Sequence, residues 1–499
     1  MAQLYDKDGN PIDVGGTIDI VRQLLSGIPI AKINDIQLYA PSGGGSYSSG
    51  SVPHGKRGIG CAKFQPIIEG AINHIVEYGQ SLSRGGDSVA ITTNIEAGCY
   101  MLGDKTNDYE STEFSLLRNI NDTDSEEGIN TGEDMIVPTI HALKYLCLQN
   151  RVDTEFLGTS SGNGGMSIDR LSKNSDSGYH LYQSHFLTHV NHAKTAATNA
   201  NKRIVCPAIM YIQGENDYGS STPYQAGYYV LSEAETEEAK YRPAIDYYKR
   251  KLVQLKNDMQ ADIMSAYGQD LKPLFFVHAV GTESPVPKGS YVNMAQIEAC
   301  AENDDMILVG APTFAPRNGV HLTGNGYRWW AEFFAKAIFE ADFLNYKFEP
   351  VCPIHISKAD NDKIIITHHV PCPPLVIDYN TVGDPEYIRN CGFYIYKGEN
   401  TITITSIEVS GCDVILTVSG TLSGTYEIRY IGHPRTNGRG NICDSQKWES
   451  LYTYMDDSEQ TYSSGEPNYR PKDENGNYIF GQKFPMQNWC VPYTKFVTF

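Results

Sequence analysis

Between residues 71 and 341, short apolar runs rich in β-branched and aromatic residues alternate with longer runs whose apolar residues recur every three or four positions. This alternation constrains the fold strongly, because successive parallel strands need a crossover connection, which is usually a helix. Strands are predicted up to Tyr78 and at Thr154–Leu157, Ala208–Ile212, Lys272–Gly281 and Met306–Val309. We therefore expect an α/β domain with a central parallel sheet and helices on both of its faces.

The clearest helix is predicted to begin near Glu237. Its apolar residues recur at spacings of three and four and form one stripe, which should pack on the sheet. The stripe consists of Ile245, Tyr248, Leu252, Leu255, Met259 and Ile263. Further helices are predicted at Asn293–Glu302 and at Thr323–Ala341, and the second of these closes the α/β domain.

The pattern changes on both sides of this region. Beyond Tyr346, short β-rich runs are separated by turns of Gly, Asn and Asp, which is typical of an all-β domain. The runs are Lys363–Thr367, Phe393–Lys397, Thr401–Val409, Asp413–Ser419 and Thr425–Ile431. Near the N-terminus, Tyr39–Gly58 is too dense in Gly and Ser for packed structure and suits a linker. We expect an N-terminal segment with its linker (1–60), the α/β domain (61–345) and a C-terminal β-rich domain with a tail (346–499).

Composition limits the partners of this chain of 499 residues. Its 40 Lys and Arg residues against 59 Asp and Glu residues give a net charge of −19, which repels nucleic acid and anionic membranes. No apolar run is long enough to span a bilayer, and the polar start MAQLYDKDGN does not support export by a signal peptide. The 11 cysteines include no C-x-x-C pair, so neither a disulfide framework nor a zinc site is indicated. We expect a soluble protein that needs no metal and no organic cofactor.

Two residues suit nucleophilic catalysis at the edge of the predicted sheet. Ser81 lies in Gly79-Gln80-Ser81, directly after the first predicted strand, where open α/β sheets place their sites. His321 lies in the GVHLTGNGY motif, on a loop before a helix that Thr323 is predicted to cap. A histidine there can act as the general base for a serine nucleophile. Without this context, the first would be an ordinary turn residue and the second an ordinary surface histidine.

Two further polar loops are predicted at the same edge of the sheet. The QGEND motif (Gln213–Asp217) follows the strand at Ala208–Ile212 and supplies an amide donor and two carboxylates, Glu215 and Asp217. The GNGGMSID motif (Gly162–Asp169) contains glycines whose N–H groups can approach a ligand closely. Each motif by itself is also compatible with a plain turn.

Together the four motifs resemble those of the SGNH hydrolases, in the branch of the sialate O-acetylesterases and related carbohydrate acetylesterases. That family carries Gly-Gln-Ser, Gly-Gly-x-Ser-Ile, Gln-Gly-Glu and His-Leu-Thr in this order, and the resemblance covers about residues 71–341. It implies a three-layer α/β/α domain in which Ser81 is the nucleophile and His321 is its base. The implied oxyanion hole comprises the N–H of Ser81, an N–H of the pair Gly164 and Gly165, and the side-chain amide of Gln213.

The chain departs from the family at Asn318. The family places an aspartate three residues before the histidine, and an asparagine there cannot stabilise an imidazolium. In one account Glu215 supplies the carboxylate from a neighbouring strand, with Asp217 as a weaker candidate. In the other, the domain has lost catalysis and only binds carbohydrate. Because the nucleophile, the base and the amide are all present, the first account is favoured.

Two other patterns point to different chemistry. Gly158–Gly162 fits the G-x-S-x-G elbow of α/β-hydrolases, with Ser160 as nucleophile, but an elbow needs a helix directly after the serine and glycines follow here. His185, His189 and His192 are spaced to share one helical face as zinc ligands, yet no carboxylate completes a zincin pattern. The GNGGMSID match and a solvated or partly packed helix face are the favoured interpretations.

The sequence therefore predicts a serine-dependent carboxylic ester hydrolase that removes O-acetyl groups from a carbohydrate through an acetyl-Ser81 intermediate. The expected partner is an acetylated polysaccharide or glycan. Esterase domains similar to this one occur in bacteriophage tail fibres and spikes, so a virion tail protein, as a homo-oligomer or in contact with other tail proteins, is a further hypothesis. The rival from another class is a catalytically inactive carbohydrate-binding or structural virion protein that retains the SGNH fold.

Overall fold

A computed structural model describes residues 63–119, 132–281, 290–382, 389–432, 438–460 and 470–499, together with four short strands near the N-terminus. Those strands form two antiparallel pairs, Leu4–Tyr5 with Pro11–Ile12 (β1, β2) and Ala31–Ile33 with Ile36–Leu38 (β3, β4). The rest of the predicted N-terminal segment, including the linker Tyr39–Gly58, lies outside the described residues.

The α/β domain is built on a seven-stranded sheet in the order β11-β10-β9-β5-β8-β6-β7. In that order the strands are Met306–Gly310, Leu274–His278, Arg203–Ile212, Ala71–Gly79, Glu155–Ser160, Cys99–Leu102 and Phe114–Leu116. Only β7 pairs antiparallel within the described sheet, against β6. The predicted α/β class with a central parallel sheet is confirmed, and β6 and β7 extend the sheet beyond the prediction.

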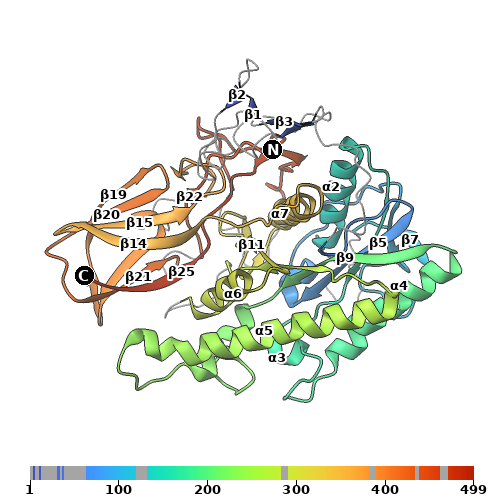
Figure 1. Ribbon diagram of the computed structural model, residues 1–499, viewed down its shortest axis with the longest axis horizontal. Coiled ribbons are helices and arrows are strands. Elements are labelled where there is room, and N and C mark those ends of the chain that lie inside the picture. The colour runs from blue at the N-terminus through green and yellow to red at the C-terminus, as the bar shows by residue number, and fades with distance from the viewer. Residues whose placement is uncertain are drawn as a thin grey trace.

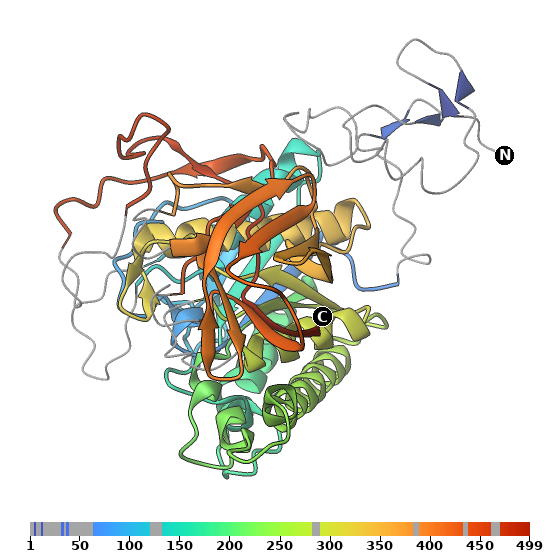
Figure 2. The same ribbon diagram turned by 90° about the vertical axis from the view of Figure 1, so that its left-hand side faces the viewer.

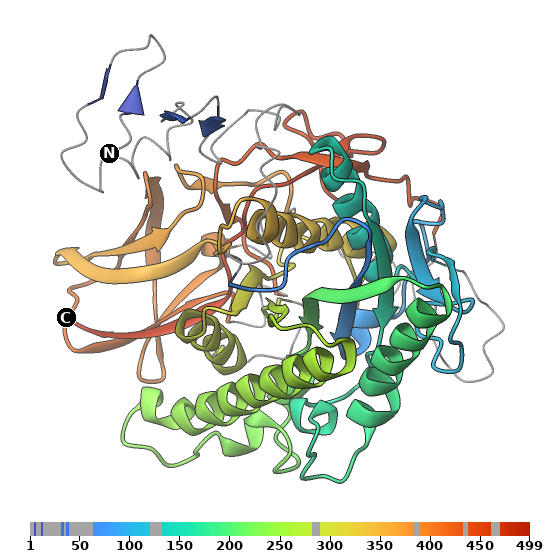
Figure 3. The ribbon, with the colours of Figure 1, turned by 45° about the vertical axis from the view of Figure 1, so that its right-hand side comes forward.

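Helices cover both faces of this sheet and make a three-layer arrangement (Figure 1). The helices α2 (Ile136–Gln149) and α7 (Gly324–Phe343) share one apolar core with one face. The other face packs against α4 (Thr188–Asn199), α5 (Glu237–Tyr267) and α6 (Tyr291–Glu302). Figure 3 shows the sheet between these two layers. Buried on both faces, β5 has nine buried residues out of nine, as expected for a central parallel strand.

The long helix α5 follows the sequence pattern closely. Its N-cap is Thr236, whose side chain accepts a hydrogen bond from the N–H of Ala239 at 3.1 Å, and Gly268 ends the helix with a φ of 63°. All the residues of the predicted apolar stripe are buried against the sheet layer. The helix is therefore positioned by its own apolar face, as the spacing of three and four requires.

The C-terminal β domain consists mainly of two four-stranded antiparallel sheets. One contains β14 (Cys352–Asp360), β15 (Lys363–His369), β20 (Asp413–Val418) and β19 (Ile404–Ser410). The other contains β18 (Asn400–Ile402), β17 (Phe393–Lys397), β21 (Thr425–Tyr430) and β25 (Tyr493–Thr498). Figure 2 shows these orange and red strands in front of the α/β domain. The predicted second, all-β domain is confirmed.

Shorter elements connect these layers. They are η2 (Ser81–Arg84), α3 (Ile168–Leu171), η3 (Tyr182–Leu187), η4 (Glu215–Tyr218), η5 (Ala226–Tyr229), β12 (Arg317–Asn318), β13 (His321–Leu322), β16 (Val376–Ile377), η6 (Arg389–Gly392), β22 (Ile442–Cys443), β23 (Glu449–Thr453) and β24 (Lys483–Pro485). The ten described cysteines are all free thiols. No helix in the described part of the chain is long and apolar enough to cross a membrane.

The C-terminal tail returns to the α/β domain and packs on α7. The indole N–H of Trp329 donates to the carbonyl of Pro485 at 2.8 Å, and the ammonium of Lys336 donates to Asn488 Oδ1 at 2.8 Å. From the same tail, the hydroxyl of Tyr452 donates to the carbonyl of Pro138 at 2.9 Å. The tail is therefore ordered by tertiary contacts, since its own sequence has little periodic pattern.

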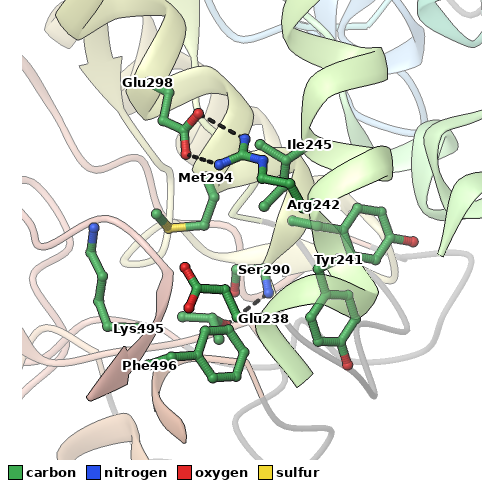
Figure 4. Close-up of a pocket in the computed structure, with 11 residues that line it drawn as sticks. Glu238, Tyr241, Arg242, Ile245, Ser290, Met294, Glu298, Lys495 and Phe496 are labelled. Atoms are coloured by element: carbon green, nitrogen blue, oxygen red, sulfur yellow. Dashed lines mark hydrogen bonds and ion pairs between the residues drawn. The ribbon is translucent and has the colours of Figure 1, made fainter. Parts of the chain in front are cut away.

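A cavity of about 160 Å³ lies where the two domains meet, between α5, α6 and β25 (Figure 4). Arg242 and Glu298 form a two-point ion pair across it at 3.0 and 2.9 Å, and the N–H of Ser290 donates to Thr494 Oγ1 at 2.9 Å. Ser81 is not among its lining residues, so this cavity is separate from the predicted nucleophile.

Candidate active site

Ser81 stands at the carboxyl end of the central strand β5. The strand can end there because Gly79 packs directly on β9, and a Cβ at this position would lie 2.0 Å from the carbonyl oxygen of Ile212. The chain then passes through extended Gln80 into the single 3₁₀ turn η2, which begins at Ser81. The half-buried hydroxyl group is thereby set at the edge of the sheet that the sequence predicted.

His321 reaches Ser81 from a small hairpin. The strands β12 and β13 pair Asn318 with His321, and Gly319 turns between them with a φ of 65°. Thr323 caps the following helix α7, as predicted, by accepting a hydrogen bond from the N–H of Gly326 at 3.2 Å. In this position His321 Nε2 lies 2.7 Å from Ser81 Oγ, which is the contact that a serine nucleophile and its base require.

The other nitrogen of His321 faces a carboxylate that the sequence analysis did not identify. Asp87 Oδ2 lies 2.7 Å from His321 Nδ1. Its backbone has a φ of 55°, which a non-glycine residue adopts rarely. Ser81, His321 and Asp87 therefore form a continuous hydroxyl–imidazole–carboxylate chain, and the nucleophile and the acid come from the same loop. The side chain of His321 is 16% exposed and that of Asp87 is 41% exposed, so substrate can reach this chain from solvent.

The loop that carries Asp87 is held close to the imidazole by its neighbours. A Cβ at Gly86 would lie 3.2 Å from His321 Cδ2, so a side chain there would press on the imidazole ring. The hydroxyl of Tyr327 donates to the carbonyl of Gly86 at 3.1 Å, and the amide of Asn318 donates to the carbonyl of Asp87 at 2.6 Å. Asn318 therefore supports the backbone of Asp87. Although Asn318 stands where the family has an aspartate, His321 Nδ1 still faces a carboxylate, that of Asp87.

Glu215 was the predicted substitute for the family's aspartate, and the geometry corrects this prediction. Its Oε1 lies 3.0 Å from Nε2 of His278, which is buried at the end of β10. The nitrogen of His321 that would receive this carboxylate instead faces Asp87. The sequence does not show how far apart two loops at the edge of the sheet lie. It therefore could not show whether Glu215 or Asp87 contacts His321.

The predicted oxyanion donor Gln213 is also placed differently. It is fully buried, and its amide nitrogen donates to Asp217 Oδ2 at 2.6 Å and to the carbonyl of Met166 at 3.2 Å. Its amide oxygen accepts from the hydroxyl of Tyr248 at 2.8 Å. Since both N–H groups of the amide are engaged in the interior, Gln213 braces the turn and does not offer a donor to substrate.

Asp217 belongs to the same internal network. Its carboxylate accepts hydrogen bonds from the N–H of Ile168 at 2.8 Å and from the N–H of Ala226 at 3.3 Å. Burial raises the pKa of this carboxyl to about 7, and the hydrogen bonds from Gln213 and the backbone oppose the rise. The network ties η4 to the loop after β8, and it has no contact with His321 among the interactions described.

Donors that do face the site come from the loop after β8 and from η4. Asn163 donates its N–H to the carbonyl of Gly79 at 2.9 Å, which fixes this loop beside β5. A Cβ at Gly164 would lie 3.9 Å from Ser81 Cβ, and Gly165 has a φ of 68°. Gly164 of the predicted pair therefore lies next to the nucleophile, and Gly165 follows it in the chain.

Asn216 is a second residue that the sequence analysis missed. Its backbone N–H donates to Oε1 of Gln80, the residue before Ser81, at 3.3 Å. Its half-buried side chain makes no hydrogen bond with any described residue. The QGEND motif contains two side-chain amides, those of Gln213 and Asn216, and only the first was predicted as an oxyanion donor.

The alternative sites are not assembled. Ser160 is fully buried and its hydroxyl donates to the carbonyl of Ser83 at 3.0 Å. His189 is also buried, with Nδ1 2.7 Å from Ser161 Oγ and Nε2 3.1 Å from the carbonyl of Asp108. Burial lowers the pKa of His189 to about 3. Within the described residues, no group of three or more His, Cys, Asp or Glu side chains is arranged to hold a metal ion.

No protein-family model matches the chain, and no curated protein matches its sequence. Among solved structures, a carbohydrate acetylesterase from Xanthomonas citri is similar over 74% of this chain and 77% of its own, with 11% identity and a TM-score of 0.47. A family two carbohydrate esterase from Clostridium thermocellum in complex with cellohexaose is similar over 55% and 65%, with 11% identity and a TM-score of 0.26. An M. smegmatis aryl esterase is similar over 53% and 97%, with 12% identity and a TM-score of 0.26.

Proposed function

We propose that this protein is a serine esterase of the SGNH type that removes acetyl groups from carbohydrates. The observation that carries the proposal is the chain from Ser81 Oγ to His321 Nε2 and from His321 Nδ1 to Asp87 Oδ2, with both distances at 2.7 Å. Such a chain activates a hydroxyl, since the imidazole accepts its proton while the carboxylate fixes the tautomer and stabilises the imidazolium.

In the proposed reaction, Ser81 Oγ bonds to the acetyl carbonyl carbon while His321 takes its proton. The carbonyl electron pair moves onto oxygen, and the N–H groups of Ser81 and Gly164 or Gly165, with the side-chain amide of Asn216, donate to this oxyanion. When the intermediate collapses, the sugar oxygen leaves and takes the proton from His321. Water then attacks acetyl-Ser81 by the same route, which releases acetate and restores the serine.

The choice of an acetylated carbohydrate rests on the order of the four motifs, which is similar to that of the sialate O-acetylesterases and related carbohydrate acetylesterases. The competing reading, a domain that binds carbohydrate without cleaving it, drew its support from Asn318. That support is weaker once Asn318 holds the backbone of Asp87 and a carboxylate faces the imidazole.

The test is acetate release from a small acetyl ester and from acetylated polysaccharides, with intact protein and with Ser81→Ala. We expect Ser81→Ala to lower kcat by about 10⁴-fold or more while the melting temperature stays close to that of the intact protein. Labelling of the intact protein by a fluorophosphonate, lost in the variant, would locate the nucleophile independently. A folded intact protein that releases no acetate from any of these substrates would favour the binding-only alternative.

The setting remains a proposal of its own. A place in a bacteriophage tail, as a homo-oligomer or beside other tail proteins, is supported by the similarity of the motifs to esterase domains of tail fibres and spikes. Mass spectrometry of intact particles tests it, and particles that lack this chain would contradict it.

A further inference from the structure

Arg84 is the last residue of the 3₁₀ turn that begins with Ser81. A 3₁₀ helix has three residues per turn, so the side chains at positions i and i+3 lie almost directly above one another. Arg84 therefore projects from the same face of η2 as the nucleophile. It lies one 3₁₀ turn from the nucleophile.

The guanidinium has no counter-ion in the described part of the chain. Arg84 makes no ion pair and no hydrogen bond there, although the side chain is half-buried and its Nε is fully enclosed. Two interior arginines have carboxylate partners, Arg429 with Glu427 and Arg470 with Asp457 at 2.7 Å. The two outer nitrogens of Arg84 are not enclosed, so they can donate to a ligand that brings an acceptor.

The surroundings of Arg84 form a wall that suits a sugar ring. Tyr109 and His185 meet edge to face with their ring centres 4.4 Å apart, and both side chains are partly exposed. Burial and the nearby charge of Arg84 lower the pKa of His185, so this imidazole is neutral and adds no second cation. Tyr109 is also stacked on the buried His189 with ring centres 4.4 Å apart, so the partly exposed His185 and the remaining surface of Tyr109 are what a sugar ring can contact beside the guanidinium.

The overall charge of the protein makes this cation selective. A net charge of −19 repels polyanions in general. A guanidinium with no carboxylate partner among the described residues is therefore a local attraction for anions on a protein that otherwise repels them. Its planar donors match the two oxygens of a carboxylate or a phosphate.

We propose that Arg84, with Tyr109 and His185 beside it, forms a subsite for an anionic group of the substrate, so that the preferred substrate is an acidic acetylated glycan. This inference rests on the esterase function proposed above. The anion lies on the same sugar as the acetyl group or on its neighbour, because one 3₁₀ turn separates the two protein groups. A uronic acid carboxylate and a phosphodiester share the required chemistry.

The experiment compares kcat/KM on three polymers: an acetylated polyuronate, an acetylated phosphodiester-linked glycan and acetylated xylan as the neutral reference. The variants are Arg84→Gln and Arg84→Lys, with Arg203→Gln as the matched control. Arg203 begins β9 at the opposite edge of the sheet, where it pairs with Ala71, so this control removes the same charge far from Ser81.

We expect Arg84→Gln to lower the ratio of acidic to neutral kcat/KM by about 10- to 100-fold, the worth of one charged hydrogen-bonded contact. Arg84→Lys should retain part of the preference, and Arg203→Gln should leave the ratio within about twofold of the intact protein. The preference of the intact protein should also weaken as salt rises, and that dependence should vanish in Arg84→Gln. The polymer that shows the larger loss identifies the anion.

Binding without turnover separates this inference from the esterase proposal. Calorimetry with an oligouronate and a phosphodiester-linked oligosaccharide uses Ser81→Ala and Ser81→Ala/Arg84→Gln, neither of which can cleave an ester. Binding to the first variant that is lost in the second supports the subsite even if no acetate is ever released. An intact protein that cleaves neutral and acidic polymers equally well, with the ratio unchanged in Arg84→Gln, would overturn the subsite and leave the esterase standing.

Discussion

The turn after β5 and the turn after β9 look equally catalytic in the sequence, yet they serve different purposes in the structure. Both follow buried strands, lie at the same edge of the sheet and carry polar side chains. After β9, Gln213 and Asp217 are fully buried and satisfy each other and the nearby backbone. After β5, Ser81 and Asp87 remain accessible and meet at the two nitrogens of His321. A polar side chain at the edge of the sheet stabilises the fold when its hydrogen-bond partners are buried, as for Gln213 and Asp217. It contributes to a candidate site when it contacts an accessible imidazole, as Ser81 and Asp87 do.

Replacing Asp87 tests this comparison most severely. In Asp87→Asn the imidazole loses the carboxylate at Nδ1, so the wrong tautomer is stabilised and the developing imidazolium is not. We expect kcat for acetate release to fall by about 10⁴-fold with little change in KM. The measurement is steady-state kinetics on a small acetyl ester, with circular dichroism to verify folding.

Glu215→Gln is the matched control for that experiment. The glutamine keeps a hydrogen-bonding group against His278, so the buried contact at the end of β10 survives in neutral form. We expect kcat to fall by less than about tenfold. If Glu215→Gln were as damaging as Asp87→Asn, Glu215 would take part in catalysis after all, and the contrast between these two carboxylates would fail.

The sequence predicted five of the seven strands of the sheet. It also predicted Ser81 and His321, two of the three residues that form the hydroxyl–imidazole–carboxylate chain. Apolar periodicity and strand-end motifs are local signals, and both Ser81 and His321 lie in such motifs. Asp87 carries no comparable signal, because it follows Arg-Gly-Gly in a loop and acquires its role only when the chain turns back at a φ of 55°. That conformation depends on contacts from Tyr327 and Asn318, more than 200 residues away.

Asn216 and Gln213 provide the second test of the comparison. Asn216→Ala removes an amide that is free to donate to an oxyanion, so we expect kcat to fall by about 10²- to 10³-fold without loss of stability. Gln213→Ala removes an internal brace, so its main effect should be a loss of stability of about 2 kcal/mol from the unpaired Asp217 and Tyr248 groups that it leaves. Kinetics and thermal melts of both variants give the two readouts. If Gln213→Ala lowered kcat and Asn216→Ala lowered only stability, Gln213 would be the oxyanion donor instead of Asn216.

Asn318→Ala tests how far the position of Asp87, in the turn after β5, depends on its hydrogen bond from Asn318. The variant keeps Ser81, His321 and Asp87 but removes the hydrogen bond that holds the carbonyl of Asp87. Because the loop is partly exposed, the Asp87 carboxylate should occupy positions away from the His321 imidazole for part of the time. We therefore expect kcat to fall by about 10-fold. The loss should be absent when Asn318→Ala is added to Asp87→Asn, since no carboxylate then remains to be positioned. Equal losses in both backgrounds would mean that Asn318 acts on something other than Asp87.

The role of the buried turn could not be read from the sequence for a related physical reason. A run such as Gln-Gly-Glu-Asn-Asp offers several amides and carboxylates within one turn, and the sequence does not say which of them point inward. Here the 3₁₀ geometry of η4 buries Asp217 and leaves Glu215 and Asn216 half-buried. Packing against α5 and the loop after β8 determines which of these side chains stabilise the turn and which remain accessible to substrate.

The smallest expected effect is on the pH dependence of stability, and it comes from Asp217 in the turn after β9. An unfolded aspartate titrates near 3.8, whereas burial raises the pKa of Asp217 to about 7 in the folded protein. Between these values the folded state binds more protons than the unfolded state, so the contribution of this group to stability is fully present below about pH 4 and is lost as pH rises through about 7. Asp217→Asn keeps one oxygen acceptor and cannot ionise. Thermal melts from pH 4 to pH 8 should therefore show a flatter dependence in Asp217→Asn than in the intact protein. Identical curves for Asp217→Asn and the intact protein would show that this carboxylate is not buried as strongly as its hydrogen-bond network indicates.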